Sequence, residues 1–325
     1  MRWRERLAVL FACGWACLAS AQTEPYPSRQ IRLIVGFPAG GASDVAARTI
    51  AGRMAELLGQ PVVVENKPGA ASNIGAEMVA RSKPDGYTVL FATISSSING
   101  SLYKKLTYDP LKDFTAVSQV SSTPFLLVVN PSAPYQTVAE LIAAAKKAGG
   151  TDKLPDYATA GNGSGSHLFT ELFTSMAGIK LSHVPYRGAA PAIADVMGGQ
   201  VPIAFDNIVT TLPQVQAGKL RALAVSTKER SKVAPDIPTL GEAGVPGYDA
   251  TAWFGLFLPV GAPAGVVNTL ANAAIKAVNT PEVSAILLKS GAEPVGSTPA
   301  EFDAFYRAEV AKWAQVIERA SVQID

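Results

Sequence analysis

The stretch Ile31–Ala47, IRLIVGFPAGGASDVAA, constrains the fold of this chain most, because it reads as a strand, a glycine turn and the start of a helix. Its apolar first half predicts the strand, a proline and two glycines interrupt it, and Ser43 or Asp44 can cap a helix that continues to about Leu58. The first backbone N–H groups of a helix have no partner within it and carry the positive end of its dipole. The turn can therefore receive a carboxylate or a phosphate, although an ordinary strand-to-helix turn of an α/β sheet explains the same pattern.

The same turn lacks both common nucleotide-binding spacings. It contains neither G-x-x-x-x-G-K-[ST] nor G-x-G-x-x-G, so it is neither a P-loop nor a dinucleotide fingerprint. Asp44 also places a negative charge near the helix start, where it opposes a doubly charged phosphate more than a singly charged carboxylate. The turn therefore favours a carboxylate as its anion.

Residues 1–21 are typical of a secretory signal peptide. Three arginines begin the segment, residues 7–18 are apolar, and Ala19-Ser20-Ala21 offers a small-residue cleavage site. We expect cleavage near Ala21–Gln22 and a soluble mature protein in the periplasm. Both cysteines of the sequence lie within the signal, so the mature chain cannot form a disulfide.

Removal of the signal leaves a chain without net charge. The full sequence carries 28 Lys+Arg and 26 Asp+Glu, and the signal holds three of the former and one of the latter, which leaves 25 of each. Scattered charges without a basic excess give no support for nucleic acid or an anionic membrane surface as a partner. Hydrophobic residues are 48% of the sequence, which at this length predicts large buried cores in two domains.

Strands and helices alternate after the first turn. Strands are predicted over Pro61–Asn66, as a buried strand, and over Tyr87–Thr93, with a helix over Ile74–Arg81 between them. Such alternation implies parallel βαβ units that bind ligands outside the carboxyl ends of their strands. The turns after these strands should therefore share one edge.

The chain passes to a second lobe through Ser121–Pro124 and returns along the predicted strand Ala252–Val260. These crossings divide the mature chain into a first lobe of residues 22–122 and 251–325 and a second lobe of residues 123–250. Both are predicted as parallel α/β. Two crossing segments are what a hinge needs.

Three helices have clear signals outside the turns. Thr137 and Glu140 form a capping box for a helix over Thr137–Ala148, and a short helix is predicted over Thr211–Ala217. The last helix, Pro299–Ile317, is amphipathic, and its apolar side chains should face inward.

The segment Asp156–Met176 repeats the plan of the first turn. It reads as a strand, the glycine turn Gly161–Gly165, and a helix that Ser164 or Ser166 can cap and that carries His167. Two lobes that each present a helix N-terminus after a glycine turn would form a pincer around one anion. A flexible surface loop is the alternative, but a turn that only reverses the chain does not need three glycines and two serines.

The two histidines of the chain, His167 and His183, do not make a metal site. His167 and Glu171 have i, i+4 spacing and could share a metal, but no further His or Cys of the mature chain completes a zinc site. We therefore expect neither a metal nor another cofactor. We expect His167 to be a hydrogen-bond donor in the first helical turn and His183 to be structural.

A serine hydrolase is the enzyme alternative. In Gly161-Asn162-Gly163-Ser164-Gly165 the serine comes one place too late for the G-x-S-x-G elbow. A nucleophile at Ser164 or Ser166 beside His167 stays open, but neighbours at a helix start point in different directions. The sequence favours a binding protein that catalyses no reaction.

Three further side chains are candidates for the rim of the site. Asp206 ends a predicted strand, where its carboxylate can accept a hydrogen bond from an amine or hydroxyl of the ligand; a helix cap or an Asx turn explains it equally well. Tyr186 and Phe37 can line the cleft as apolar walls, or belong to the core.

Several longer segments together are specific to a known family, among them IRLIVGFPAGGASDVAAR at 31–48, PVVVENKPGAASNIGAE at 61–77 and HVPYRGAAPAIADVMGGQV at 183–201, with PDGYTVLFAT at 84–93, YDPLKDF at 108–114 and IPTLGEAGVPGY at 237–248. Through them the mature chain resembles the Bug receptors, the extracytoplasmic solute-binding components of tripartite tricarboxylate transporters. The resemblance implies a two-lobed, type II-like periplasmic binding protein of α/β class. Its cleft between the lobes would close on a small carboxylate, held by the backbone and hydroxyls of the two turns and partly through ordered water.

Matched onto this chain, the resemblance implies a set of ligand-binding residues in the two turns, in the loop after the third strand and at one rim position: Phe37, Ala39, Gly40, Gly41, Ser43, Asp44, Thr93, Ser95, Asn162, Ser164, Ser166, His167 and Asp206. The rim position, Asp206, meets an amino group of the ligand in some members. We expect Asp44→Ala or Ser166→Ala to weaken binding with little effect on folding.

The resemblance also implies partners. Members take acidic amino acids, citrate-like acids or aromatic acids, and no basic residue of the two turns selects among them. We expect a monomer that offers its closed form to membrane subunits of the transporter. A sensor role feeding a two-component system stays open as an alternative.

Overall fold

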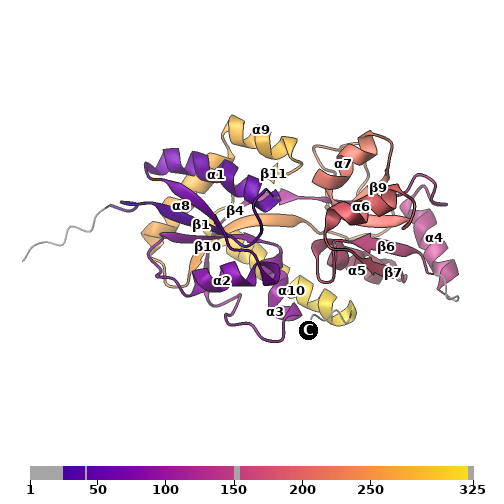
Figure 1. The fold of residues 1–325 in the computed structure, drawn as a ribbon, viewed down its shortest axis with the longest axis horizontal. Helices are drawn as coiled ribbons and strands as arrows, with labels where there is room; N and C mark the ends of the chain where they lie inside the picture. Colours follow the sequence, from indigo (N-terminus) through magenta and orange to yellow (C-terminus); the bar gives the residue numbers. More distant parts are fainter. Residues whose placement is uncertain (1–24, 41, 150–153, 321–325) are drawn as a thin grey trace, which may run out of the picture.

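The computed structural model describes residues 25–320 except 41 and 150–153 (Figure 1). The predicted signal peptide, its cleavage site and the candidate residue Gly41 lie outside the described residues. The described strands form two sheets, which lie side by side along the long axis of the molecule, each covered by helices (Figure 1). The fold is a two-lobed α/β architecture, as the sequence predicted.

The first sheet has the strand order β11-β4-β10-β3-β1-β2 within the described chain. Its strands are β1 (Ile31–Val35), β2 (Val62–Asn66), β3 (Thr88–Thr93), β4 (Phe114–Thr123), β10 (Ala252–Pro259) and β11 (Glu293–Pro294). Its helices are α1 (Ala42–Leu58), α2 (Asn73–Ala80), α3 (Ser95–Leu102), α8 (Ala264–Val278), α9 (Pro281–Lys289) and α10 (Pro299–Ala320). In Figure 1, α1 and α9 lie above this sheet, and α2, α3 and α10 lie below it; α8 packs against α1 in the same core.

Alternation along β1 explains how one strand serves two cores. Ile31, Leu33 and Val35 pack with the apolar faces of α1 and α8. Ile34 points to the opposite face and joins the core that α2, α3 and α10 cover. Because successive side chains of a strand alternate between faces, a strand covered on both sides must be apolar throughout.

The second sheet has the strand order β7-β6-β8-β5-β9 within the described chain. Its strands are β5 (Phe125–Val129), β6 (Asp156–Thr159), β7 (Ser182–Pro185), β8 (Ile203–Asn207) and β9 (Arg221–Val225), and its helices are α4 (Val138–Ala148), α5 (Gly165–Ala177), α6 (Ala189–Met197) and α7 (Ile208–Gln216). The prediction of Thr137 as the α4 cap is confirmed, since its hydroxyl accepts the Glu140 N–H at 3.1 Å.

Both sheets are mixed, so the prediction of purely parallel lobes was wrong. β5 runs antiparallel to β8 and β9, and β10 runs antiparallel to β3 and β4. β5 and β10 are antiparallel to their neighbours because each carries the chain from one sheet to the other. A strand that carries the chain across begins at the junction, beside the end of a neighbour, as the pairs Phe125–Asn207 and Phe254–Thr93 show.

Some predicted bounds also change. The first crossing segment, predicted as Ser121–Pro124, is a single residue, Pro124, because β4 continues through Thr123 and β5 begins at Phe125. Pro124 has no N–H group to donate to a neighbouring strand, so it interrupts the hydrogen bonds of the sheet. β2 is an edge strand, not a buried one, and the side chain of Val63 is 39% exposed. The helix predicted from Thr211 begins at Ile208, and α3 was not predicted, because its serines are weak helix formers and packing against α10 decides its structure.

The two crossing segments meet at one buried serine. The Ser226 hydroxyl donates to the Ala250 carbonyl at 2.6 Å and accepts the Phe125 N–H at 2.9 Å. The amide of Ala250 in turn donates to the Ser226 carbonyl at 2.9 Å. The chain leaving the first sheet and the chain returning to it are therefore tied together where they pass between the sheets.

Helix α10 connects the two halves a second time. The ring of Trp313, near its end, stacks on Phe169 of α5 with centroids 5.2 Å apart and planes 4° apart. The predicted inward faces of Phe302, Trp313 and Ile317 are confirmed by their burial. Among the described residues, no helix is long and apolar enough to cross a membrane.

Candidate functional site

A cavity of about 600 Å³ opens at the carboxyl ends of β1 and β3. Its lining includes these residues that the sequence singled out: Phe37, Ala39, Gly40, Ser43, Thr93 and Ser95. Pro38, Ala42, Ile94 and Phe254 complete it. The turn and the third-strand loop therefore do share one edge of the sheet, as a parallel arrangement of β1 and β3 requires.

Phe254 was missed by the sequence analysis, which predicted Ala252–Val260 only as the strand that returns to the first lobe. It enters the site because β10 pairs antiparallel to β3, with Phe254 beside Thr93. Its ring also packs on Phe91, with centroids 5.3 Å apart. The cavity thus combines aromatic walls with the hydroxyls of Ser43, Thr93 and Ser95 and the first turn of α1.

Asp44 does not line this cavity; its carboxylate turns back and holds the turn that does. Oδ2 accepts the Gly40 N–H at 2.9 Å and the Arg48 Nε–H at 3.0 Å, and Oδ1 accepts from Asn66 Nδ2 at 2.9 Å. The Arg48 hydrogen bond, with those of Gly40 and Asn66, lowers the pKa of Asp44 to about 2 against the opposing effect of burial. Asp44 is therefore a charged brace.

Asn66 completes the brace, and the sequence analysis named neither Asn66 nor Arg48 as a site residue. The Asn66 amide also donates to the Phe37 carbonyl at 3.0 Å, and its oxygen accepts from the Arg48 guanidinium at 3.1 Å. The i, i+4 spacing of Asp44 and Arg48 was a usable signal, since such pairs face each other on a helix. No local pattern could place Asn66, which comes from β2.

The second turn is held by neutral groups. The Ser164 hydroxyl donates to the Gly161 carbonyl at 2.7 Å and accepts the His167 N–H at 3.3 Å, so Ser164 is the predicted cap of α5. The Ser166 hydroxyl accepts the Ala160 N–H at 2.9 Å and lies 2.9 Å from that of Ser164. Both hydroxyls are thus engaged within the turn, and His167 makes no side-chain bond to either.

His167 is an acceptor where the sequence predicted a donor. Its Nδ1 accepts the Gly163 N–H at 3.1 Å, and its ring stacks on His183 with centroids 4.0 Å apart. Burial, with a smaller effect of His183, lowers the pKa of His167 to about 4. The ring is therefore neutral at pH 7 and faces the interior of its lobe.

Backbone donors of the second turn are available for a ligand. Within the described chain, no hydrogen bond occupies the backbone N–H groups of Asn162, Gly165 and Ser166. Gly165 and Ser166 are the first two residues of α5, where the helix dipole favours an anion.

The side chains of Asp206 and Tyr186 form hydrogen bonds within their own lobe. Asp206 is 5% exposed, and its Oδ1 accepts the Asn207 N–H at 2.6 Å; burial raises its pKa to about 6. The cap of α7 is Asn207, so the cap explanation for Asp206 was wrong. The Tyr186 hydroxyl donates to Asp195 of α6 at 2.7 Å.

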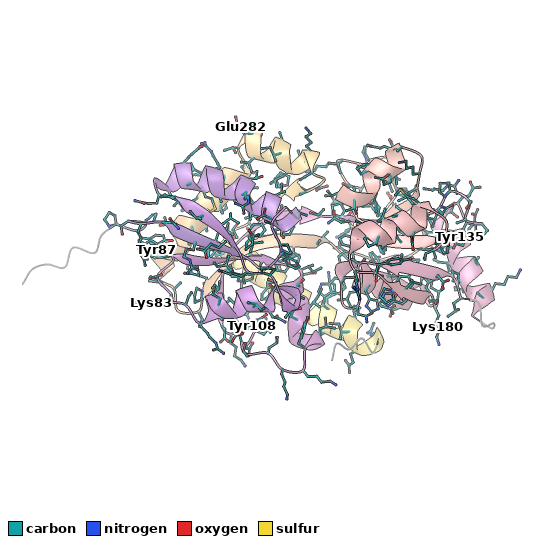
Figure 2. The ribbon with its side chains drawn as sticks, in the orientation of Figure 1. Lys83, Tyr87, Tyr108, Tyr135, Lys180 and Glu282 are labelled. Carbon is teal, nitrogen blue, oxygen red and sulfur yellow. The ribbon has the colours of Figure 1, made fainter. Side chains whose placement is uncertain are left out.

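The two turns lie on the inner ends of their lobes. Lys83 and Tyr87 mark the outer end of the first lobe, and Tyr135 and Lys180 mark that of the second (Figure 2). Since β3 begins just after Tyr87, its carboxyl end points toward the second lobe. β7 begins just after Lys180 and runs parallel to β6, so β6 ends toward the first lobe.

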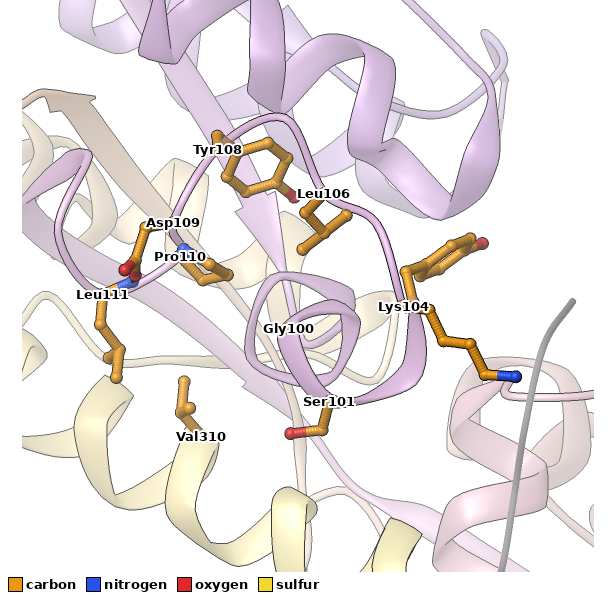
Figure 3. Close-up of a pocket in the computed structure, with 10 residues that line it drawn as sticks. Gly100, Ser101, Lys104, Leu106, Tyr108, Asp109, Pro110, Leu111 and Val310 are labelled. Atoms are coloured by element: carbon orange, nitrogen blue, oxygen red, sulfur yellow. The ribbon is translucent and has the colours of Figure 1, made fainter.

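The described cavity contains residues of the first lobe alone. The second-lobe candidates Asn162, Ser164, Ser166, His167, Tyr186 and Asp206 do not line it. A further pocket of about 380 Å³ lies between α3, the loop after it and α10, lined among others by Lys104, Tyr108 and Val310 (Figure 3). It contains none of the candidate residues. Among the described residues, no cluster of His, Cys, Asp and Glu could hold a metal.

Comparison with known proteins identifies the family of the chain and agrees with its fold. The family described as "Tripartite tricarboxylate transporter family receptor" (TctC) matches residues 46–322. BugT of Bordetella pertussis is 36% identical over 313 residues, 96% of this chain and 94% of that protein. Among solved structures, R. palustris Rpa4515 with adipate is 36% identical with a TM-score of 0.79, covering 92% of this chain and 100% of that one. MatC of Rhodopseudomonas palustris with bound malate is 33% identical with a TM-score of 0.75, covering 90% and 100%. The chain therefore belongs to the TctC/Bug family of periplasmic solute-binding receptors, whose members bind ligands and are not enzymes.

Proposed function

We propose that this protein captures a small carboxylate between two lobes, residues 22–122 with 251–325 and residues 123–250, by domain closure. As a monomer it would then offer the closed form to the membrane subunits of a tripartite tricarboxylate-type transporter. The observation that carries the proposal is the pair of glycine turns, each opening a helix N-terminus at the inner end of its lobe.

The chemistry of the two turns is complementary to one carboxylate. The first lobe supplies the hydroxyl of Ser43 at the start of α1 and that of Ser95 in the loop after β3. The second supplies the free N–H groups of Gly165 and Ser166 at the start of α5. Both helix starts favour negative charge, and closure would exclude water and strengthen each of these hydrogen bonds.

The apolar walls suggest how the rest of the ligand is accommodated. Phe37 and Phe254 line the cavity, and no basic side chain is part of its described lining. The structural relatives with adipate and with malate both hold short dicarboxylic acids. A short organic acid with an apolar or weakly polar body therefore suits this site, and adipate and malate are the first probes.

The experiment is thermal melting of the mature protein against a panel of adipate, malate, aspartate, citrate and benzoate, with adipamide as an uncharged control. A ligand that binds only the folded state raises its stability by about 2.7 kcal/mol at 100 times Kd. We expect a selective rise in Tm with one acid and none with the diamide. No shift with any acid, after denaturation and mass spectrometry show that no ligand was carried through purification, would contradict the proposal.

A further inference from the structure

A column of three rings lies directly behind the second turn. His167 of α5 stacks on His183 of β7 with centroids 4.0 Å apart, and His183 stacks on Tyr157 of β6 with centroids 5.0 Å apart. His167 is only 7% exposed. The second turn therefore rests on a stack that includes two histidine rings, of which His167 is buried and His183 is partly buried.

Both histidines hold glycine N–H groups of the turn in place. Gly163 N–H donates to His167 Nδ1 at 3.1 Å, so this nitrogen carries no proton and Nε2 carries the proton of the neutral ring. His183 Nε2 lies 2.6 Å from the Thr159 hydroxyl, whose oxygen accepts the Gly161 N–H at 3.2 Å. His167 thus holds one glycine directly, and His183 holds the other through Thr159.

A proton on His167 would remove this support. Protonated Nδ1 is a donor, and it would face the Gly163 N–H, which is also a donor, at hydrogen-bond distance. The new charge would also lie against the ring of His183 in a buried position. Gly163 has φ +69°, which a glycine adopts as readily as a negative φ, so steric restriction of Gly163 does not fix the turn and its hydrogen bonds do.

We propose that His167 is a positioning residue: its neutral imidazole keeps the Gly161–Gly165 turn in the form that receives the carboxylate, and protonation of the His167–His183 pair releases the turn. The consequence for binding rests on the receptor function proposed above. The positioning of the turn does not, since it is a property of the ligand-free protein.

The groups around the pair decide where it titrates. Glu171 of α5 has Oε1 at 3.9 Å from His167 Nε2, and the same oxygen accepts the Tyr157 hydroxyl at 2.5 Å. Burial lowers the pKa of His183 and that of His167, the latter to about 4. Asp206, with a pKa raised to about 6 by burial, is a buried acid of the same lobe and must be controlled for.

The first arm of the test needs no ligand. In ¹⁵N NMR spectra of the mature protein, the Gly163 amide should shift with a midpoint near pH 4. His167→Asn places an acceptor oxygen where Nδ1 lies but cannot titrate, so its Gly163 amide should stay unshifted down to pH 3.5. Asp206→Asn should leave the Gly163 midpoint unchanged. An equal shift in wild type and His167→Asn would overturn the proposal.

The second arm measures the Kd of adipate, or of the acid that raised Tm most, at pH 7.5 and pH 3.5. Half a unit below a midpoint of about 4, three quarters of the wild-type molecules carry the proton, so wild type should bind about fourfold more weakly than His167→Asn. Comparison at equal pH cancels the ionisation of the ligand. His167→Leu, which leaves the Gly163 N–H without an acceptor, should bind roughly tenfold more weakly at pH 7.5.

The two arms separate the two proposals. A Gly163 titration that His167→Asn abolishes, together with no binding of any acid at pH 7.5, supports the positioning role and overturns the receptor function. If the acid binds tightly at pH 7.5, and its affinity falls equally at pH 3.5 in wild type and His167→Asn, the positioning role is overturned and the receptor function is supported. Circular dichroism at each pH confirms that all variants are folded.

Discussion

The first and second turns follow the same plan of strand, glycine turn and helix, yet different chemistry holds each of them. A carboxylate and a guanidinium brace the first turn, through Asp44 and Arg48. Hydroxyls and neutral imidazoles brace the second, through Ser164 and His167. Although both turns open a helix N-terminus, they can therefore respond to solution conditions in different ways.

The first turn is supported by a charged pair, and the second by neutral groups. Asp44 lies close to the place where the anion would bind, and its own negative charge is compensated by Arg48 at 3.0 Å. Because its pKa is about 2, the Asp44 carboxylate keeps its negative charge down to about pH 3. The described residues of the second turn hold no comparable charged pair, and the positioning role proposed for His167 would make its protonation the event that weakens binding in acid.

Asp44→Ala should have the largest effect. It removes the acceptor of Gly40, Asn66 and Arg48 together. We expect the free energy of unfolding to fall by about 3–4 kcal/mol, at roughly 1 kcal/mol for each bond from a neutral donor and somewhat more for the bond from the Arg48 guanidinium. Binding should weaken at least tenfold because the turn loses its shape. Urea denaturation and calorimetry with the best acid measure both.

This expectation replaces that of little effect on folding, which assumed that Asp44 faces the ligand. The matched control is Asp303→Ala, whose partner Arg307 has the same i, i+4 spacing at 2.7 Å but is exposed. An exposed pair contributes about 0.5 kcal/mol or less. If Asp44→Ala is no less stable than Asp303→Ala, the brace is not a structural feature of the first turn.

The pH dependence of the free energy of unfolding should also distinguish the two turns. The folded-state pKa of His167 is depressed to about 4, so the unfolded chain binds this proton first, from about pH 6.5 downward. The contribution of His167 is fully present above pH 6.5 and is lost between pH 6.5 and 4, by at most about 3 kcal/mol. Asp44, depressed from 3.8 to about 2, loses its contribution only below about pH 4.

Asp206 acts in the opposite sense, because its folded-state pKa is raised to about 6 and its contribution is lost as pH rises through that value. The quantity to measure is therefore the difference in free energy of unfolding between wild type and His167→Asn, by urea denaturation from pH 4 to 7.5. This difference should shift in favour of His167→Asn as pH falls. A difference independent of pH would show that His167 titrates normally.

The sequence was a good guide to the plan of the fold and a poor guide to strand direction. Apolar runs, glycine turns and the Thr137 cap are local signals, and they placed most elements within a few residues. Whether β5 and β10 run parallel or antiparallel depends on where the chain crosses between sheets. That is a long-range property, which strand–helix alternation does not encode.

The residues of the candidate site also fall into those that local sequence signals could predict and those that depend on long-range pairing. The turn residues Phe37, Gly40 and Ser43 could be predicted, because a helix start after a glycine turn has its own chemistry. Phe254 and Asn66 could not, since each reaches the site through pairing with a strand far away in sequence. Side-chain direction also escaped prediction, and it makes Asp44 and His167 supports of the turns.

Ser164→Ala should have the smallest effect and tests whether the second turn matters beyond its helix. It removes the cap of α5 and should cost about 1 kcal/mol of unfolding free energy. Thr137→Ala removes the equivalent cap of α4, away from the site, and should cost a similar amount. If the second turn is part of a ligand site, the two variants should lose the same stability but differ in affinity. Ser164→Ala should raise Kd several-fold, and Thr137→Ala should leave Kd unchanged. Equal affinities would mean that the cap serves α5 alone and that the first turn carries the anion without help from the second.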